Sequence, residues 1–239
     1  MLANPVIVRG DLPHRQNIKS SAGRLAIDIS EWIMSQLPKT WDEIFKNQGK
    51  VFIEPHAAIP GLVRLLKERG ARTLLDFGSG SGRHVIYLAK AGFSVFGFDH
   101  SPKGIQFTRE WLGQEGLCAN LLLGDMAEKL PYSDNFFDGM IAVQVIHHAR
   151  IAVIRHLIGE IWRILRRGGV LFVTVPVSKN PKLQYERIEP DTYIPLDGRE
   201  RGLPHHYFTP KELYAEFSDF QIIGIHMDAN RHYCLFGRK

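Results

Sequence analysis

Short apolar runs recur through the middle of the chain, separated by segments that mix apolar and charged residues. The runs lie at residues 74–77, 93–98, 121–123, 136–146 and 170–175. Between the last two, apolar residues follow the spacing of one helix face, at Ile154, Leu157, Ile158, Ile161 and Leu165. Short buried strands that alternate with amphipathic helices are typical of an α/β sandwich with a mainly parallel sheet.

The flanking segments predict further elements around these runs. Helices are expected from about Ser21 to Gln36 and from Ile59 to Arg69. The pairs Ser101-Pro102 and Thr209-Pro210 predict helix starts, because a hydroxyl caps free amide groups and proline suits the first helical position. Two alternating or apolar stretches within residues 220–237 predict a terminal strand hairpin.

We divide the chain of 239 residues into one core domain with additions. Residues 1–69 form an N-terminal helical extension or lid, 70–176 the core, 177–208 a cap, and 209–239 a terminal helix and strand hairpin. The cap is too long for an ordinary connection. It holds four prolines, and its five Lys and Arg balance five Asp and Glu. This composition predicts an ordered cover for a modest substrate and disfavours a polyphosphate clamp.

The segment from Leu74 to His84 carries an acid straight into three alternating glycines. Asp76 is followed by Gly78, Gly80 and Gly82, which let the backbone turn tightly and approach a ligand closely. A dinucleotide fingerprint would need its third glycine at position 83, where an arginine stands, so a NAD site is disfavoured. Asp76 would repel a phosphate and attract an ammonium or sulfonium. The segment therefore predicts a pocket for a nucleotide that carries a positive charge.

Two more acids follow the next two strands. Asp99 stands 23 residues beyond Asp76 and is expected to accept the hydroxyls of a ribose, with a simple capping role as the alternative. Asp125 is expected to accept from the exocyclic amine of adenine. Met126 offers a polarizable surface to that ring, or else fills the core. Three strands thus present acids at one edge of the sheet.

In their order, these motifs resemble those of the class I S-adenosylmethionine-dependent methyltransferase family, over about residues 70–176. The resemblance implies a three-layer Rossmann-like fold whose seven mainly parallel strands include one antiparallel strand. It also implies an enzyme that binds S-adenosyl-L-methionine and releases S-adenosyl-L-homocysteine. The cofactor-binding residues that we expect are Asp76, Gly78, Ser79, Gly80, Gly82, Asp99, His100, Gly124, Asp125, Met126 and Gln144.

Methyl transfer is an in-line displacement, so a general base is needed only when the accepting atom carries a proton. His147 and His148 follow the fourth strand, and His205 and His206 lie in the cap. We favour His148 as the base, while an ordinary hydrogen-bonded role remains open for all four. Adjacent side chains diverge on a helix or a strand, and neither pair has a further ligand at helical spacing, so we expect no metal site.

Aromatic and polar residues before the core are candidates for a lid over the cofactor and substrate. They are Trp41, Phe45, Phe52, Glu54 and His56. Packing against the sheet is an equal alternative for them.

The net charge of +5 and a pI near 9.2 raise the alternative of a nucleic-acid substrate. Five arginines concentrate on the helix after the fourth strand, at Arg150, Arg155, Arg163, Arg166 and Arg167. Because the same segment has an apolar stripe, a solvated outer face explains them. No zinc-type cysteine cluster or RNA-recognition motif accompanies them in the sequence.

Cys118 and Cys234 are the two cysteines of the sequence, which favours a reducing compartment over a disulfide framework. No apolar stretch approaches the roughly twenty residues that cross a bilayer, and the start lacks a secretory pattern. We therefore expect a cytoplasmic protein without a membrane partner. A small-molecule acceptor is the favoured substrate. An RNA, such as tRNA, and a non-catalytic module that binds the cofactor are the alternatives, and the sequence does not predict the oligomeric state.

Overall fold

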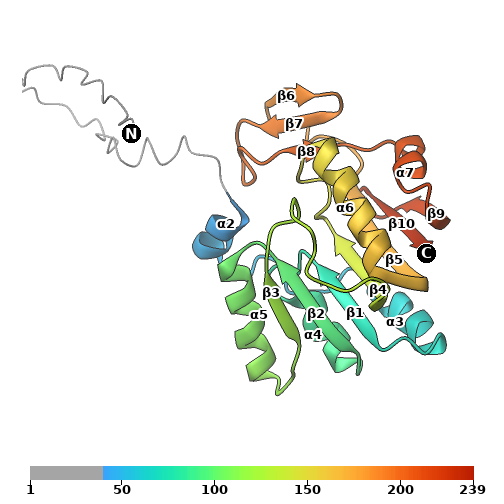
Figure 1. Cartoon of the computed structure of the whole chain (residues 1–239). Coiled ribbons are helices and arrows are strands. Elements are labelled where there is room, and N and C mark those ends of the chain that lie inside the picture. Colours follow the sequence, from blue (N-terminus) through green and yellow to red (C-terminus); the bar gives the residue numbers. More distant parts are fainter. Residues whose placement is uncertain (1–39) are drawn as a thin grey trace, which may run out of the picture. The chain divides into compact units, whose positions relative to one another are not determined.

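The structure is a computed structural model that describes residues 40–239, and the helix expected from Ser21 to Gln36 lies outside the described residues. A seven-stranded sheet forms the centre of the described part (Figure 1). In spatial order its strands are β3 (Asn120–Leu123), β2 (Ser94–Asp99), β1 (Thr73–Phe77), β4 (Phe137–Val143), β5 (Leu165–Pro176), β10 (His232–Arg238) and β9 (Gln221–Met227).

One strand of this sheet runs against the others. β1 to β5 pair in parallel, whereas β10 is antiparallel to both β5 and β9. The expected seven strands with one antiparallel strand are therefore confirmed. Because the first five strands are parallel, their carboxyl ends meet at one edge. β10 begins at that same edge, where His232 lies opposite Pro176.

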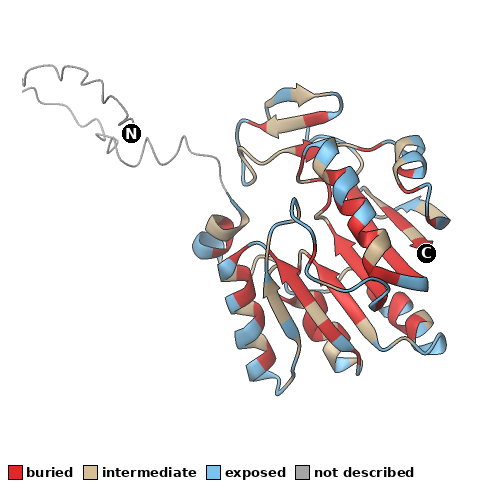
Figure 2. Cartoon of the chain, in the orientation of Figure 1, coloured by how far each residue is buried: buried red, intermediate tan, exposed pale blue. Residues whose placement is uncertain are grey.

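Helices cover both faces of the sheet and make it the middle of three layers. On one face α3 (Ile59–Glu68), α4 (Arg83–Lys90) and α5 (Pro102–Gln114) contribute to a core with Leu74 and Ile141. On the other face α6 (Ile151–Ile164) and α7 (Pro210–Glu216) pack over Leu75 and Met140. The faces alternate along each strand, and β4 is buried over its whole length, as Figure 2 shows.

The cap forms a small sheet of its own. β6 (Tyr185–Glu189), β7 (Thr192–Pro195) and β8 (His205–His206) are antiparallel. The backbone N–H of His206 donates to the carbonyl of His147 at 2.8 Å. The cap is thereby joined to the loop that follows β4.

A short helix, α2 (Trp41–Gln48), begins with a capping box between Thr40 and Glu43. Its Asp42 accepts hydrogen bonds from the Ser101 hydroxyl and the Lys103 backbone N–H, both at 2.7 Å. This one carboxylate holds α2 against the start of α5.

The predicted helix starts are confirmed, since Ser101 and Thr209 both cap their helices by side-chain hydrogen bonds. The terminal hairpin is confirmed as β9 and β10. Within residues 40–239 no helix is long and apolar enough to span a membrane.

Candidate active site

The loop after β1 adopts a backbone that only glycine accommodates without strain. Gly78, Gly80 and Gly82 have φ values of 70°, 53° and 95°. A Cβ on Gly78 would lie 2.1 Å from a methyl carbon of Val145. The loop is therefore bare backbone, in close contact with the segment that follows β4.

Asp76 lies beneath this loop with only 1% of its surface exposed. Neither of its carboxyl oxygens has a hydrogen-bond partner among the described residues, and the hydroxyl of Ser79 is also unpartnered. The nearest basic group is His84, whose Nδ1 lies 3.8 Å from Oδ1 of Asp76. A buried carboxylate without donors is costly, so the site fits a ligand that brings an ammonium group and hydrogen-bond donors.

Asp99 at the end of β2 ties the loop in place. Its two oxygens accept from the backbone N–H of Gly80 at 2.7 Å and of Ser101 at 2.8 Å. Burial raises the pKa of this carboxyl against the effect of those bonds. The N-cap of α5 is Ser101, so Asp99 does not itself cap that helix, and each of its oxygens keeps a second lone pair for the predicted ribose contact. His100 beside it is exposed.

At the end of β3 the expected adenine-side residues are less enclosed. Asp125 is exposed, and its Oδ1 accepts from the backbone N–H of Ala127 at 2.9 Å. Gly124 donates to the carbonyl of Asp99 at 3.0 Å, which brings the ends of β2 and β3 together. Met126 packs against the core cluster and is partly buried, so it does fill the core, while its contact with adenine stays a prediction.

Gln144 directly follows β4 and has a left-handed conformation, with φ of 59°. Such a backbone is uncommon for a residue with a side chain and is often found at functional sites. Its backbone and side-chain N–H groups both donate to the hydroxyl of the buried Thr174, at 3.1 Å. Gln144 is held at the junction of β4 and β5 with its side-chain oxygen available.

His147, His148 and His205 come together at the same edge. The ring centroids of His147 and His148 are 4.0 Å apart, and the ring of His205 lies 4.5 Å from that of His148. The expectation that the adjacent rings diverge is wrong. The two residues lie in a tight turn closed by a hydrogen bond from His148 to Val145, and so on neither a helix nor a strand.

Both rings of this turn are held neutral. Burial, with the neighbouring His205, lowers the pKa of His148 to about 3, and burial lowers the pKa of His147 well below its usual value. The Nδ1 atoms of both rings are buried without a hydrogen-bond partner among the described residues. A group with a pKa of about 3 is a weak proton acceptor near neutral pH, which speaks against His148 as a free general base.

The two cap histidines have different surroundings. His205 places Nδ1 2.8 Å from the Leu203 carbonyl and Nε2 2.7 Å from a carboxyl oxygen of Glu200. His206 uses both ring nitrogens, on Thr192 at 2.7 Å and on Glu212 at 2.9 Å. Because Glu212 belongs to the capping box of α7, His206 connects the cap to that helix and has no nitrogen left for chemistry.

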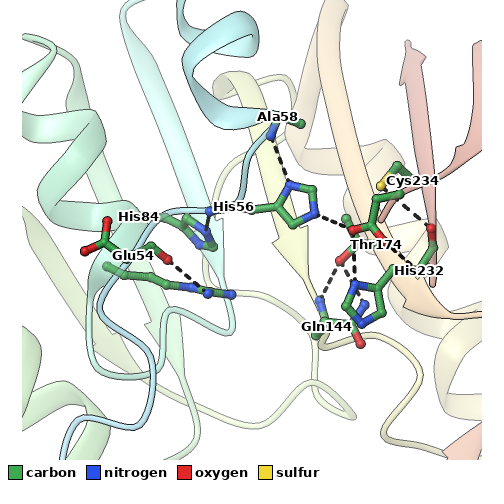
Figure 3. A network of polar contacts seen from close by, with 10 residues as sticks. Glu54, His56, Ala58, His84, Gln144, Thr174, His232 and Cys234 are labelled. Atoms are coloured by element: carbon green, nitrogen blue, oxygen red, sulfur yellow. Dashed lines mark hydrogen bonds and ion pairs between the residues drawn. The ribbon is translucent and has the colours of Figure 1, made fainter. Parts of the chain in front are cut away.

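Sequence reasoning missed a second histidine group, shown in Figure 3 beside Gln144 and Thr174. His232 lies 3.2 Å through Nδ1 from an oxygen of Asp228, which also lies 3.0 Å from Nε2 of His56. Burial opposes ionisation of Asp228, but hydrogen bonds from His232 and His56 hold the pKa of its carboxyl below the usual value.

The available signal was the spacing from Asp228 to His232 at the hairpin, combined with the antiparallel direction of β10. That direction returns the turn of the hairpin to the edge where the parallel strands end.

The segment after α2 crosses the glycine loop and is bonded to it. The Phe52 carbonyl accepts from the Ser81 hydroxyl, and the Glu54 carbonyl accepts from Arg83, both at 3.1 Å (Figure 3 draws the second contact). His56 donates its backbone N–H to His84, also at 3.1 Å.

Two of the lid candidates on α2 lie directly at the site. The ring of Phe45 would lie 3.3 Å from a Cβ on Gly80. Trp41 meets the ring of His148 edge-on, with centroids 5.5 Å apart. Trp41 and Phe45 therefore pack against residues of this edge, and their role as a lid over the cofactor and substrate stays a prediction.

Most of the arginines around α6 form ion pairs. Arg155 meets Glu216 at 2.7 Å, and Arg163 meets both Glu160 and Asp134. The remaining pairs are Arg150 with Glu189 and Arg166 with Asp138. These pairs reduce the charge that this face could offer to phosphates.

Comparisons with known proteins agree on one kind of chemistry. The sequence profile of a family described as a methyltransferase domain matches residues 75–173. An uncharacterized methyltransferase of Mycobacterium bovis is 30% identical over 182 residues, which cover 74% of this chain and 71% of that protein. A tRNA U34 carboxymethyltransferase of Marinobacter nauticus is 33% identical over 132 residues, covering 54% of this chain and 38% of that protein.

Among the solved structures with a similar fold is one that matches over most of its length. It is the 1,6-didemethyltoxoflavin-N1-methyltransferase of Burkholderia thailandensis, with bound 1,6-didemethyltoxoflavin and S-adenosylhomocysteine. It matches with a TM-score of 0.59 and 20% identity, over 88% of this chain and 86% of that one. At this identity the likeness concerns the fold.

Proposed function

Because this chain belongs to the class I S-adenosylmethionine-dependent methyltransferase family, we propose that it methylates a small molecule enclosed at the carboxyl edge of its sheet. The observation that carries the proposal is the double cover of that edge. The segment from Trp41 to His56 is bonded to the glycine loop on one side, and the cap sheet is bonded to His147 on the other. A closed site of this kind excludes water and suits a modest acceptor.

The bound cofactor supplies an electrophilic methyl group on a sulfonium. We assign the unpartnered carboxylate of Asp76 to its ammonium group and the glycine loop to its close backbone contacts. Asp99 has lone pairs left for the ribose hydroxyls, and Asp125 with Met126 stands where adenine is expected. Gly124, Ser79, His100 and Gln144 complete the assigned set.

For an acceptor that carries a proton, His232 is the better general base among the described histidines. Asp228 holds its Nδ1, which leaves Nε2 to take a proton from the acceptor. The carboxylate also stabilises the imidazolium that forms. His148 lacks such a partner and has a pKa of about 3, so it remains neutral during the reaction.

An RNA acceptor is the second candidate, favoured by the basic pI and by the similarity to the tRNA carboxymethyltransferase. The ion pairs of Arg150, Arg155, Arg163 and Arg166 count against it, as does the balanced charge of the cap. A non-catalytic module would not need an aspartate-histidine pair at its covered edge.

A direct comparison of substrates tests the proposal. The purified protein is incubated with S-adenosylmethionine labelled in the methyl group, and either bulk tRNA or a low-molecular-weight cell extract. We expect label to enter the small-molecule fraction and this transfer to fall in the His232→Gln variant. Transfer to tRNA that weakens steeply with salt would instead establish the RNA acceptor. Tight cofactor binding without transfer to either fraction would favour the non-catalytic module.

A further inference from the structure

The three imidazoles at the covered edge form a group that the methyl-transfer proposal does not use. One ring nitrogen from each of His147, His148 and His205 lies within 4.8 Å of those of the other two. The rings come from two parts of the chain, the turn after β4 and strand β8. A backbone hydrogen bond from His206 to His147 holds these parts together.

In two of these rings one buried nitrogen lacks a hydrogen-bond partner among the described residues. Nδ1 of His147 and Nδ1 of His148 have no partner within residues 40–239. The Nε2–H of His148 donates to the backbone carbonyl of Pro204, so the ring proton is on Nε2 and Nδ1 is a bare acceptor.

The third ring, His205, has a hydrogen-bond partner at each of its two nitrogens. Nδ1 of His205 faces the carbonyl of Leu203 and must donate to it. Nε2 then faces a carboxyl oxygen of Glu200 at 2.7 Å. A distance of 2.7 Å is that of a hydrogen bond, so a proton lies between Nε2 and this oxygen in the metal-free protein, and a bound metal ion would displace that proton.

We propose that His147, His148, His205 and Glu200 bind one divalent transition-metal ion of the zinc type. Neutral imidazoles with a single carboxylate are the ligand set that zinc and its neighbours prefer. The bonds from His148 to the Pro204 backbone and from His205 to the Leu203 carbonyl fix the rings from outside, as outer hydrogen bonds do in metal sites. Zinc–nitrogen bonds of about 2.0–2.1 Å require the three ring nitrogens to lie close together, and the observed grouping meets this requirement within 4.8 Å.

The other histidine group serves as a comparison. His56, Asp228 and Cys234 also place ligand atoms within 4.8 Å of one another. His56 already uses Nδ1 on the Ala58 backbone and Nε2 on Asp228, and Asp228 also holds His232. Both ring nitrogens of His56 therefore have hydrogen-bond partners already, and neither is left to bind a cation.

Metal titration of the full chain tests the site. Protein stripped with a chelator is titrated with Zn²⁺ by calorimetry and with Co²⁺ by visible absorption, which reports nitrogen and oxygen ligation. We expect one ion per chain. His148→Gln and His205→Gln should each weaken Zn²⁺ binding by at least about 100-fold, and Glu200→Gln by about 10-fold.

Two matched variants serve as controls. His226→Gln removes an exposed histidine of β9, and His56→Gln alters the satisfied group. Both should bind Zn²⁺ as the wild type does. The proposal is overturned if the wild-type chain binds no ion, if His148→Gln and Glu200→Gln bind as tightly as the wild type, or if only His56→Gln loses the ion.

Cofactor binding separates this outcome from failure of the fold or of the proposed function. Each variant is also titrated with S-adenosylhomocysteine, whose assigned contacts lie at Asp76 and Asp99. Unchanged affinity for this nucleoside together with lost Zn²⁺ binding supports the metal site. About a third of the Glu200 side-chain surface is exposed, so the Glu200→Gln substitution should not disturb folding. This variant remains informative even if a histidine variant fails to fold.

Discussion

The edge of the sheet has two halves that leave different atoms unpaired. On the β1 side the atoms without a partner among residues 40–239 are the Ser79 hydroxyl and the two oxygens of Asp76, a hard and charged group. On the β4 side they are the Nδ1 atoms of His147 and His148, which are neutral. Both halves call for a cationic partner, but the carboxylate suits an organic ammonium, whereas neutral imidazoles suit a transition metal. The type of lone pair, and not burial alone, distinguishes the two sites.

His232 and His148 differ in that His232 has a carboxylate partner, Asp228, and His148 has none. We therefore expect His232 to react and His148 to be inert. Asp228→Asn should lower kcat by about 10²- to 10⁴-fold, because His232 loses the group that orients it and stabilises its charged form. Steady-state kinetics across pH measures the effect. Affinity for S-adenosylhomocysteine should stay within about twofold of the wild type. A variant with normal kcat and pH profile would remove His232 from the mechanism.

The β1 side is tested by a substitution that removes the charge of Asp76 and keeps the size of its side chain. Asp76→Asn should weaken S-adenosylmethionine binding by about 100-fold, since a charged hydrogen bond contributes about 1.5–3 kcal/mol. The free energy of unfolding of the ligand-free protein should not fall, because a buried carboxylate without donors is lost. Calorimetry and urea unfolding measure the two quantities.

Asp125→Asn is the matched control for this charge, because Asp125 is exposed. It should lower affinity by less than about tenfold. Equal losses in the two variants would mean that the buried Asp76 contributes no more to cofactor binding than the exposed Asp125 does.

The neutral state of His148 makes folding stability depend on pH. The pKa of its ring is about 3 in the folded protein and about 6.5 when unfolded, so the unfolded chain takes up the proton first as pH falls. Stability from this group is therefore complete above about pH 6.5 and declines towards pH 3. The loss is at most about 1.4 kcal/mol per pH unit. Urea unfolding in chelator at pH 7.5, 6.0 and 5.0 should show a shallower dependence in His148→Gln than in the wild type, and parallel curves would contradict the neutral state.

The smallest effect is expected on the outer face of α6, away from both halves. Arg155→Ala breaks an exposed ion pair with Glu216 and should cost about 0–1 kcal/mol of stability. Binding to bulk tRNA, followed by a filter assay at low salt, should change by less than about twofold. A larger loss would show that this face binds phosphates and would favour RNA over a small molecule as the acceptor.

The β1 side of the edge could be predicted from sequence because each of its features is local. The acid and glycines around Asp76 lie in one segment, and a strand that runs straight into a turn fixes where they point. The fold followed from the same alternation of apolar runs, whose faces pack as the two-residue period requires.

The β4 side required contacts between distant segments. Adjacency of His147 and His148 suggested divergence, but a turn that no glycine or proline marks brings their rings together. Asp228 and His232 reach the edge only through the pairing of β10 with β5. The ion pairs of Arg155 and Arg163 likewise depend on partners that sequence spacing does not reveal.

The carboxylate of Asp42 has a kinetic consequence. Because it bonds both the Ser101 hydroxyl and the Lys103 backbone at the start of α5, α2 lies across the loop assigned to the cofactor. We expect α2 to detach before the spent nucleoside leaves, so product release would limit turnover whenever chemistry is fast. The Asp42→Asn variant should then exchange nucleoside faster than the wild type while binding it less tightly, a rate that stopped-flow displacement measures directly.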